Sequence, residues 1–281
     1  MSWSIVVASL AVVAAACGGV TAKGPSVSLL PTPSSTTSSE TGSPTSTAAT
    51  PTSADVLYFT RGHLLGAARR TVEAGSEDPR HAALEVLLAG PDQAETADGL
   101  GSDIPTGTDL RGLSVSDGVA TVNFGPSFSA PAPQASQLAR VAQVVFTLTE
   151  FSGVSSVTFT IAGAPLGSFG GISLANPVGR SQLAGALPPL ALESPISGDS
   201  VGRTLEIKGT ATYSGTFRFQ LLSSSGTVIV DSLHTAVAGG TFDDTVPVPR
   251  GQSGIATARI AALTSSGDVT SEIQLLLPIS T

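Results

Sequence analysis

Residues 188–281 consist of short runs in which apolar and polar residues alternate, and turns rich in Gly and Ser separate the runs. Alternation with a period of two places successive side chains on opposite faces of a strand. In the run TFRFQLL, for example, Phe217, Phe219 and Leu221 alternate with polar residues. Evenly spaced strands without a helical stretch favour two packed antiparallel sheets, so we expect a β-sandwich in this part of the chain.

Residues 55–166 show helical periodicity as well as alternation. Asp78 followed by Pro79 is typical of the start of a helix, and Gly90 is typical of its end. A longer helix is expected over residues 134–148, where apolar residues recur at spacings of three and four: Leu138, Val141, Val145 and Leu148.

Strands are expected on both sides of these helices, in the runs ADVLYFT, RRTVEA, LRGLSVS, VATVNF and VSSVTFTIAGAPL. Asp117-Gly118, between two of these runs, predicts a two-residue β-hairpin turn. Residues 167–187 lack clear periodicity apart from a possible short helix near VGRSQLAG, so they are expected to connect two domains. The fold class expected for the whole chain is therefore α+β.

Four motifs, in their order along residues 55–166, resemble the GerMN domain of bacterial sporulation and germination proteins and of actinobacterial lipoproteins. These are ALEVLLAGP, GLGSDIPTGTDL, SVSDGVATVNF and VVFTLTEFSGVSSVTFTIAG. The resemblance implies a compact α/β fold from exported envelope proteins, without established catalytic residues.

Residues 188–281 resemble the Gmad2 domain, an immunoglobulin-like module that often follows GerMN. The motifs are ESPISGDSVGRTLEIKGTAT, QLLSSSGTVIVDS, GTFDDTVPV and SSGDVTSEIQLLLPI. Where the resemblance implies an aromatic residue followed by an acid, this chain has Tyr213 followed by Ser214.

The apolar run IVVASLAVVAAA is too short to span a membrane, which takes about 20 residues, but it suits the core of a signal peptide over residues 1–16. Together with the small residues that follow, it resembles a bacterial lipobox. The resemblance implies cleavage between Ala16 and Cys17 and diacylation of the Cys17 thiol. An ordinary secretory signal, or a signal anchor with an incidental cysteine, remains open.

Residues 17–54 are rich in Ser, Thr and Pro and have no apolar periodicity, which predicts a disordered, partly extended linker that O-glycosylation could modify. Two acyl chains on one cysteine give stable membrane attachment. We therefore expect the protein at the extracytoplasmic face of the cell membrane, with a lipid on Cys17 as its membrane contact.

Candidate chemical residues are few. His63 and His81 have no second His or Cys at metal-ligand spacing, so we expect solvated or structural histidines. Glu77 and Asp78 precede a helix and are expected to interact with its N-terminus. Glu150 could bind a partner, but a structural hydrogen bond is the favoured reading.

In the second half, His234 is expected beyond the end of a strand and exposed. Asp243-Asp244 could hold Ca²⁺ between sandwich loops, although adjacent acids more often mark a solvated turn. Asp117 is expected to be a turn residue. We therefore expect no metal and no cofactor.

The chain has no H-E-x-x-H and no P-loop, so it is not expected to be an enzyme and no catalytic residue is assigned. Its net charge of −8 disfavours nucleic acid. The favoured function is a lipid-anchored binding or scaffold protein whose partners are peptidoglycan or envelope proteins, linked to cell-wall assembly or to processes like sporulation. A solute-binding lipoprotein is the alternative, and a wall-modifying enzyme is less favoured.

Overall fold

The computed structural model describes residues 52–73 and 77–280. Contacts divide the chain into Met1–Thr47 and Ala48–Thr281, and every described residue belongs to the second unit. The predicted signal peptide, the predicted cleavage and lipidation site at Ala16 and Cys17, and the predicted linker up to residue 51 lie outside the described residues. None of the helices in the described part is both long and apolar enough to cross a membrane.

Residues 52–187, here called the α/β part, contain a hairpin, a mixed sheet and two longer helices. The elements in chain order are β1 (Thr52–Arg61), β2 (Leu64–Glu73), α1 (Pro79–Ala89), α2 (Gln93–Ala97), β3 (Leu110–Ser116), β4 (Val119–Phe124), η1 (Pro126–Ser129), α3 (Gln134–Leu148), β5 (Ser156–Ile161), β6 (Ala164–Pro165), β7 (Ser168–Phe169), β8 (Ile172–Ser173) and η2 (Arg180–Ala186).

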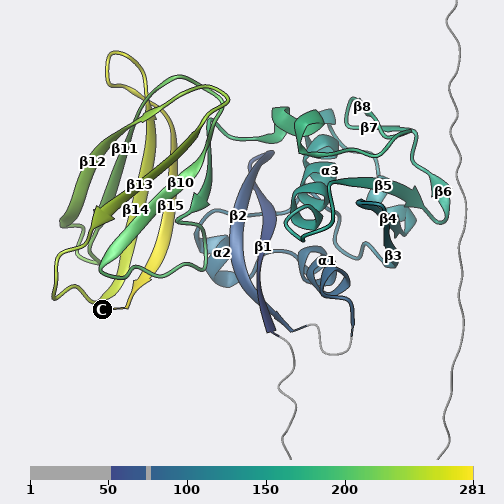
Figure 1. The fold of residues 1–281 in the computed structure, drawn as a ribbon, viewed down its shortest axis with the longest axis horizontal. Helices are drawn as coiled ribbons and strands as arrows, with labels where there is room; N and C mark the ends of the chain where they lie inside the picture. Colours follow the sequence, from purple (N-terminus) through teal and green to yellow (C-terminus); the bar gives the residue numbers. More distant parts are fainter. Residues whose placement is uncertain (1–51, 74–76, 281) are drawn as a thin grey trace, which may run out of the picture. The chain divides into compact units, whose positions relative to one another are not determined.

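Helix α3 connects two parallel strands of the mixed sheet, whose order is β3-β4-β5-β6. The strands β1 and β2 form a separate antiparallel hairpin that also packs on α3. Figure 1 shows α3 between this hairpin and the strands β4 and β5. One hydrophobic core joins side chains from the hairpin, both longer helices and the sheet, among them Phe59, Leu87, Val145 and Phe159.

The C-terminal two-thirds of α3 are buried on every side, from Ala139 to Leu148. The predicted apolar stripe is present, but the helix also buries Arg140, Gln143 and Thr147. These polar side chains have partners within the fold. For example, Arg140 donates hydrogen bonds to the backbone oxygens of Asp103, Phe128 and Ala130 at 2.7–2.9 Å. A helix covered on both faces can hold such groups only because each finds an acceptor.

The structure confirms both predicted helices and the predicted hairpin turn. Asp78 accepts the backbone N–H of Arg80, with Pro79 at the first helical position, and α3 spans the expected residues. Asp117 and Gly118 have φ of 52° and 79°, the left-handed pair that a tight hairpin requires. The expected connection over residues 167–187 contributes to the first core with five buried residues: Phe169, Leu174, Val178, Leu183 and Ala186.

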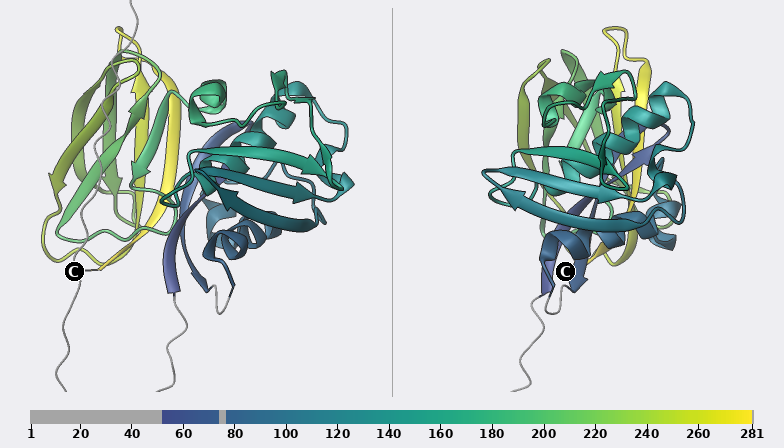
Figure 2. Two further views of the ribbon diagram at one scale, coloured as in Figure 1. Left: turned by 45° about the vertical axis from the view of Figure 1, so that its right-hand side comes forward. Right: turned by 90° about the vertical axis from the view of Figure 1, so that its right-hand side faces the viewer.

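Residues 188–280, here called the two-sheet part, contain only strands. They are β9 (Leu190–Ser194), β10 (Thr204–Ala211), β11 (Gly215–Leu222), β12 (Val228–Ala236), β13 (Thr241–Pro247), β14 (Gly254–Leu263) and β15 (Val269–Ile279). One antiparallel sheet has the order β13-β10-β9 and the other β12-β11-β14-β15. The strands appear in green to yellow in Figure 2. A second core lies between the sheets, with Phe217, Phe219 and Leu221 fully buried as predicted.

Candidate functional site

A groove with a volume of about 280 Å³ lies where the C-terminal end of α3, η2 and β9 meet. Its lining is mostly apolar, with three hydroxyl groups and two charged side chains. Ligand sites often occupy such junctions between structural parts. The lining residues are Tyr58, Phe146, Arg180, Ser181, Ala184, Leu187, Ala191, Leu192, Glu193 and Thr210.

Arg180 is fixed in this groove by contacts on several sides. Its guanidinium donates to Thr149 Oγ1 at 2.7 Å and to the backbone oxygen of Phe146 at 3.0 Å, and it also pairs with Glu150. It lies 4.8 Å from the ring centroid of Phe146 and 5.5 Å from that of Tyr58, within the range of cation–π attraction. The groove therefore has a preformed wall rather than a flexible side chain.

Tyr58 forms the buried side of the same wall. Its hydroxyl donates to Glu150 Oε1 at 2.8 Å, and its backbone N–H donates to Thr147 Oγ1 at 3.0 Å. Burial raises the pKa of Tyr58 well above its ordinary value, and the Glu150 carboxylate raises it further. Glu150 thus makes the structural hydrogen bond that we favoured from the sequence, and Tyr58 remains a neutral donor.

Glu193 supplies the uncompensated charge of the groove. It is exposed on β9, and its negative charge contributes to raising the pKa of Tyr58. Within residues 52–73 and 77–280 it has no hydrogen-bond or ion-pair partner, whereas Arg180 is neutralised by Glu150. The groove therefore combines an apolar surface with one free carboxylate.

Asp98 joins the α/β part to the two-sheet part, although neither it nor its partners line the groove. It is 6% exposed, and its carboxylate accepts from Ser197 Oγ at 2.5 Å and from the backbone N–H of Leu276 at 2.7 Å. Arg69 adds an ion pair to Asp199, with Nε and Oδ1 2.7 Å apart. A buried carboxylate with two donors from the other part favours one fixed arrangement of the two parts.

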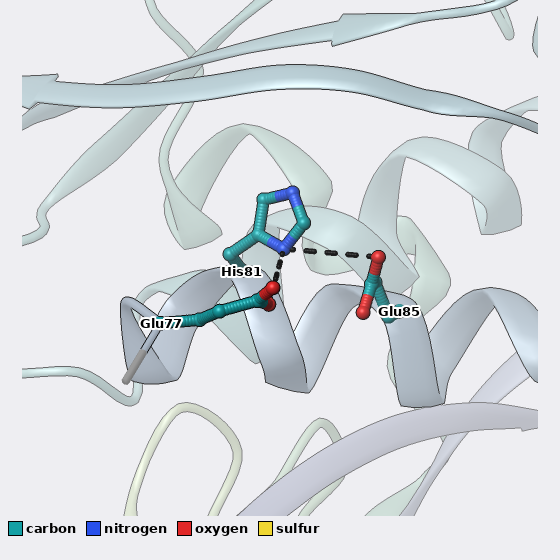
Figure 3. A group of neighbouring side chains, drawn as sticks. All are labelled: Glu77, His81 and Glu85. Carbon is teal, nitrogen blue, oxygen red and sulfur yellow. Dashed lines mark ion pairs between the residues drawn. The ribbon is translucent and has the colours of Figure 1, made fainter. Parts of the chain in front are cut away.

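The predicted histidines of the α/β part lie apart from the groove lining. His63 is in the turn between β1 and β2, and its Nδ1 is 3.1 Å from Asp103 Oδ1. His81 lies on α1 between Glu77 and Glu85, as Figure 3 shows. The sequence analysis looked only for a second His or a Cys as a metal-ligand partner of His81. It therefore missed the carboxylates of Glu77 and Glu85, which lie four residues before and after it.

The prediction for His234 is wrong. It lies inside β12 opposite Phe217, its side chain is 9% exposed, and its ring stacks on that of Phe217 at 5.1 Å between centroids. Nε2 is 2.7 Å from Ser232 Oγ, and Nδ1 is 2.8 Å from Asp244 Oδ2. The run VIVDSLHTA continues as a strand through His234, because its alternation places the imidazole on the core side.

These three side chains have the order of a nucleophile, a base and a carboxylate. In hydrolases that use this trio the carboxylate is buried. Here the Asp244 side chain is 46% exposed, whereas the imidazole is enclosed. The arrangement satisfies both ring nitrogens of a buried histidine and links β12 to β13, so we assign it a structural role.

The sequence favoured a turn for Asp243 and Asp244. The structure places both residues inside β13. Neighbouring residues of a strand point to opposite faces. Asp243 accordingly lies 3.7 Å from Nζ of Lys208, and Asp244 faces His234. Their carboxylates cannot converge on one calcium ion, so this candidate site is excluded.

Solved structures of GerMN domains are among the proteins to which this chain is similar. No curated protein matches the chain. A structure of the tandem GerMN domains of the sporulation protein GerM from Bacillus subtilis is 18% identical, with a TM-score of 0.41; the match covers 68% of this chain and 63% of that one. The first GerMN domain of the same protein is 22% identical, with a TM-score of 0.38, over 46% of this chain and 98% of that one.

The resemblance of the α/β part to GerMN is confirmed by a family model, whereas the resemblance of residues 188–281 to Gmad2 stays a prediction. The chain contains a segment, residues 56–167, that matches the Germane family, described as sporulation and spore germination.

Proposed function

We propose that the protein is a membrane-anchored, extracytoplasmic lipoprotein that binds a cell-envelope component without catalysing a reaction. The Germane match over residues 56–167 supports a link to processes like sporulation or cell-wall assembly. The apolar run before Cys17 supports export and lipidation of that residue. The long Ser/Thr/Pro-rich segment that follows would give the anchored protein reach.

The observation that carries the binding role is the buried contact that Asp98 makes between the α/β part and the two-sheet part. Its carboxylate accepts from the Ser197 hydroxyl and from the backbone N–H of Leu276, which favours one fixed arrangement of the α/β part and the two-sheet part. The groove has walls from both parts, with Phe146 on one side and Leu192 on the other. A groove of fixed width costs a ligand less free energy to occupy than one that must first be assembled.

The strand order supports an immunoglobulin-like classification of the two-sheet part. Three strands, β13-β10-β9, face four, β12-β11-β14-β15, and the connections cross between sheets in the manner of that fold. Such sandwiches serve as binding modules through loops and edges, although the fold alone does not define a partner. Peptidoglycan and envelope proteins are the partners that we propose.

A small solute is the second candidate ligand, because the groove has an apolar lining and the volume of a small binding pocket. It would be favoured if isolated amino acids or sugars bound the groove with the affinity of intact wall material. The net charge of −8 continues to disfavour nucleic acid.

The test is co-sedimentation of residues 48–281 with purified cell-wall sacculi at moderate salt. Ala184 is exposed and lines the groove, so Ala184→Arg should obstruct it without disturbing the core. Ala238→Arg, at an exposed loop of the two-sheet part, is the control with the same change of charge. We expect saturable binding that is lost in the first variant and kept in the second.

Equal binding by both variants would contradict the groove as the binding site. Absence of binding by the unaltered protein would exclude peptidoglycan, and protein partners would then be sought by crosslinking in cells.

A further inference from the structure

Three side chains that commonly bind metals gather at α1, as Figure 3 shows: His81 and Glu85 from the helix, and Glu77 from just before its N-cap Asp78. Glu77, His81 and Glu85 are four residues apart, a spacing that stacks side chains on successive turns. His81 Nδ1 lies 3.4 Å from Glu77 Oε2 and 3.8 Å from Glu85 Oε1. The three ligand atoms all lie within 4.8 Å of one another.

The Nδ1 atom of His81 is closed off from solvent and makes no hydrogen bond within the described residues. Both carboxylate oxygens lie beyond the normal hydrogen-bond distance from it. A shielded polar atom without a hydrogen bond is costly, and few remain in folded proteins without a reason. An ion between the three side chains would give this nitrogen a partner.

The distances fit a tetrahedral zinc ion. Bonds of about 2.0–2.2 Å place neighbouring ligands of such an ion about 3.4 Å apart. The two separations at His81 Nδ1 are close to this value, and the exposed carboxylates can adjust by rotation. One imidazole nitrogen and two carboxylate oxygens form a ligand set used by zinc, and leave the fourth position for water. Magnesium and calcium prefer oxygen ligands alone.

We propose that Glu77, His81 and Glu85 bind a divalent transition-metal ion with the coordination chemistry of zinc. The other two histidines have different surroundings. His63 faces one carboxylate, that of Asp103, and His234 already has partners at both ring nitrogens. The site is therefore specific to α1, and it is independent of the groove and of the proposed function.

The experiment is calorimetric titration of the full-length chain in detergent with zinc chloride, with magnesium chloride as a second titrant. The protein carries Cys17→Ser throughout, so that the thiol cannot contribute a ligand. We expect one zinc ion per chain and no response to magnesium. His81→Ala and Glu85→Gln should each weaken zinc binding at least about tenfold, since each removes one of three ligands.

His63→Ala is the matched control, because it removes an exposed histidine beside a carboxylate, and it should leave zinc binding unchanged. Glu85→Gln preserves the shape of an exposed side chain, so it tests the site even if His81→Ala disturbs the helix. In NMR spectra zinc should shift the ring signals of His81 and not those of His63 or His234. The proposal is overturned if zinc does not bind stoichiometrically, or if all three variants bind it equally.

Discussion

The ionisable side chains around the groove have separate roles that their environments determine. Glu150 accepts from Tyr58 and pairs with Arg180, so these three groups hold one another in place. Glu193 lies nearby without a partner among the described residues. The same residue type is therefore structural at one position and available to a ligand at another, and only the fold distinguishes the two.

Tyr58→Phe tests the structural role of the contact between Tyr58 and Glu150. At pH 7 we expect a loss of about 1 kcal/mol in the free energy of unfolding, because the hydrogen bond to Glu150 is removed. Burial raises the pKa of Tyr58, so above about pH 10 the unfolded tyrosine releases its proton while the folded one keeps it. That linkage lowers the stability of the unaltered protein as pH rises, and the phenylalanine variant lacks it.

The difference between the two proteins should therefore shrink above about pH 10, which urea unfolding at pH 7 and at pH 10.5 would measure. Tyr213→Phe is the control, because Tyr213 is less buried and its hydroxyl donates to the backbone oxygen of Thr216. If the difference in free energy of unfolding between the unaltered protein and Tyr58→Phe stayed the same at both pH values, the buried, neutral state of Tyr58 would be contradicted.

At the scale of elements, the short helix α2 depends on one buried acid. Glu95 is 3% exposed, accepts the backbone N–H of Asp92 at 2.8 Å, and pairs with Arg70 of β2, whose Nε lies 2.6 Å from Oε1. A five-residue helix has little stability of its own. The ion pair therefore fixes α2 to the β1–β2 hairpin.

Glu95→Ala should lower the free energy of unfolding by about 3 kcal/mol, since it leaves the largely buried Arg70 with only the exposed Asp92 carboxylate, 3.9 Å from its Nε. Glu206→Ala is the matched comparison: it removes one of two exposed partners of Lys208 and should cost much less than Glu95→Ala. Chemical unfolding of both variants measures the contrast. Similar losses would show that the burial of Glu95 does not matter.

Local signals made some elements predictable. Asp78, Pro79 and Gly90 bound α1, and Asp117-Gly118 forms the expected hairpin turn, because capping and left-handed backbone depend on neighbouring residues alone. Arg140 inside the core, Glu95 in α2 and His234 in β12 were not predictable. Their partners lie 10 or more residues away in sequence, or on another element, and periodicity contains no information about such pairs.

At the scale of the whole molecule, two separate hydrophobic cores form one compact unit. The sequence predicts two domains with a connection over residues 167–187, and several side chains of this connection pack into the first core. Small joints between such parts commonly allow relative motion. Here the joint includes a buried carboxylate, that of Asp98, and the half-buried ion pair between Arg69 and Asp199.

Asp98→Ala should therefore uncouple the two parts. The change leaves the Ser197 hydroxyl and the Leu276 N–H without their acceptor, which costs about 2 kcal/mol or more. Because the joint contributes this free energy only while both cores are folded, we expect one cooperative transition in the unaltered protein and two in the variant. Differential scanning calorimetry would resolve them.

Asp268→Ala, in an exposed hairpin loop, should retain a single transition. If Asp98→Ala also unfolds in one step at an unchanged temperature, the two parts are coupled by other contacts, and the fixed width of the groove does not depend on Asp98.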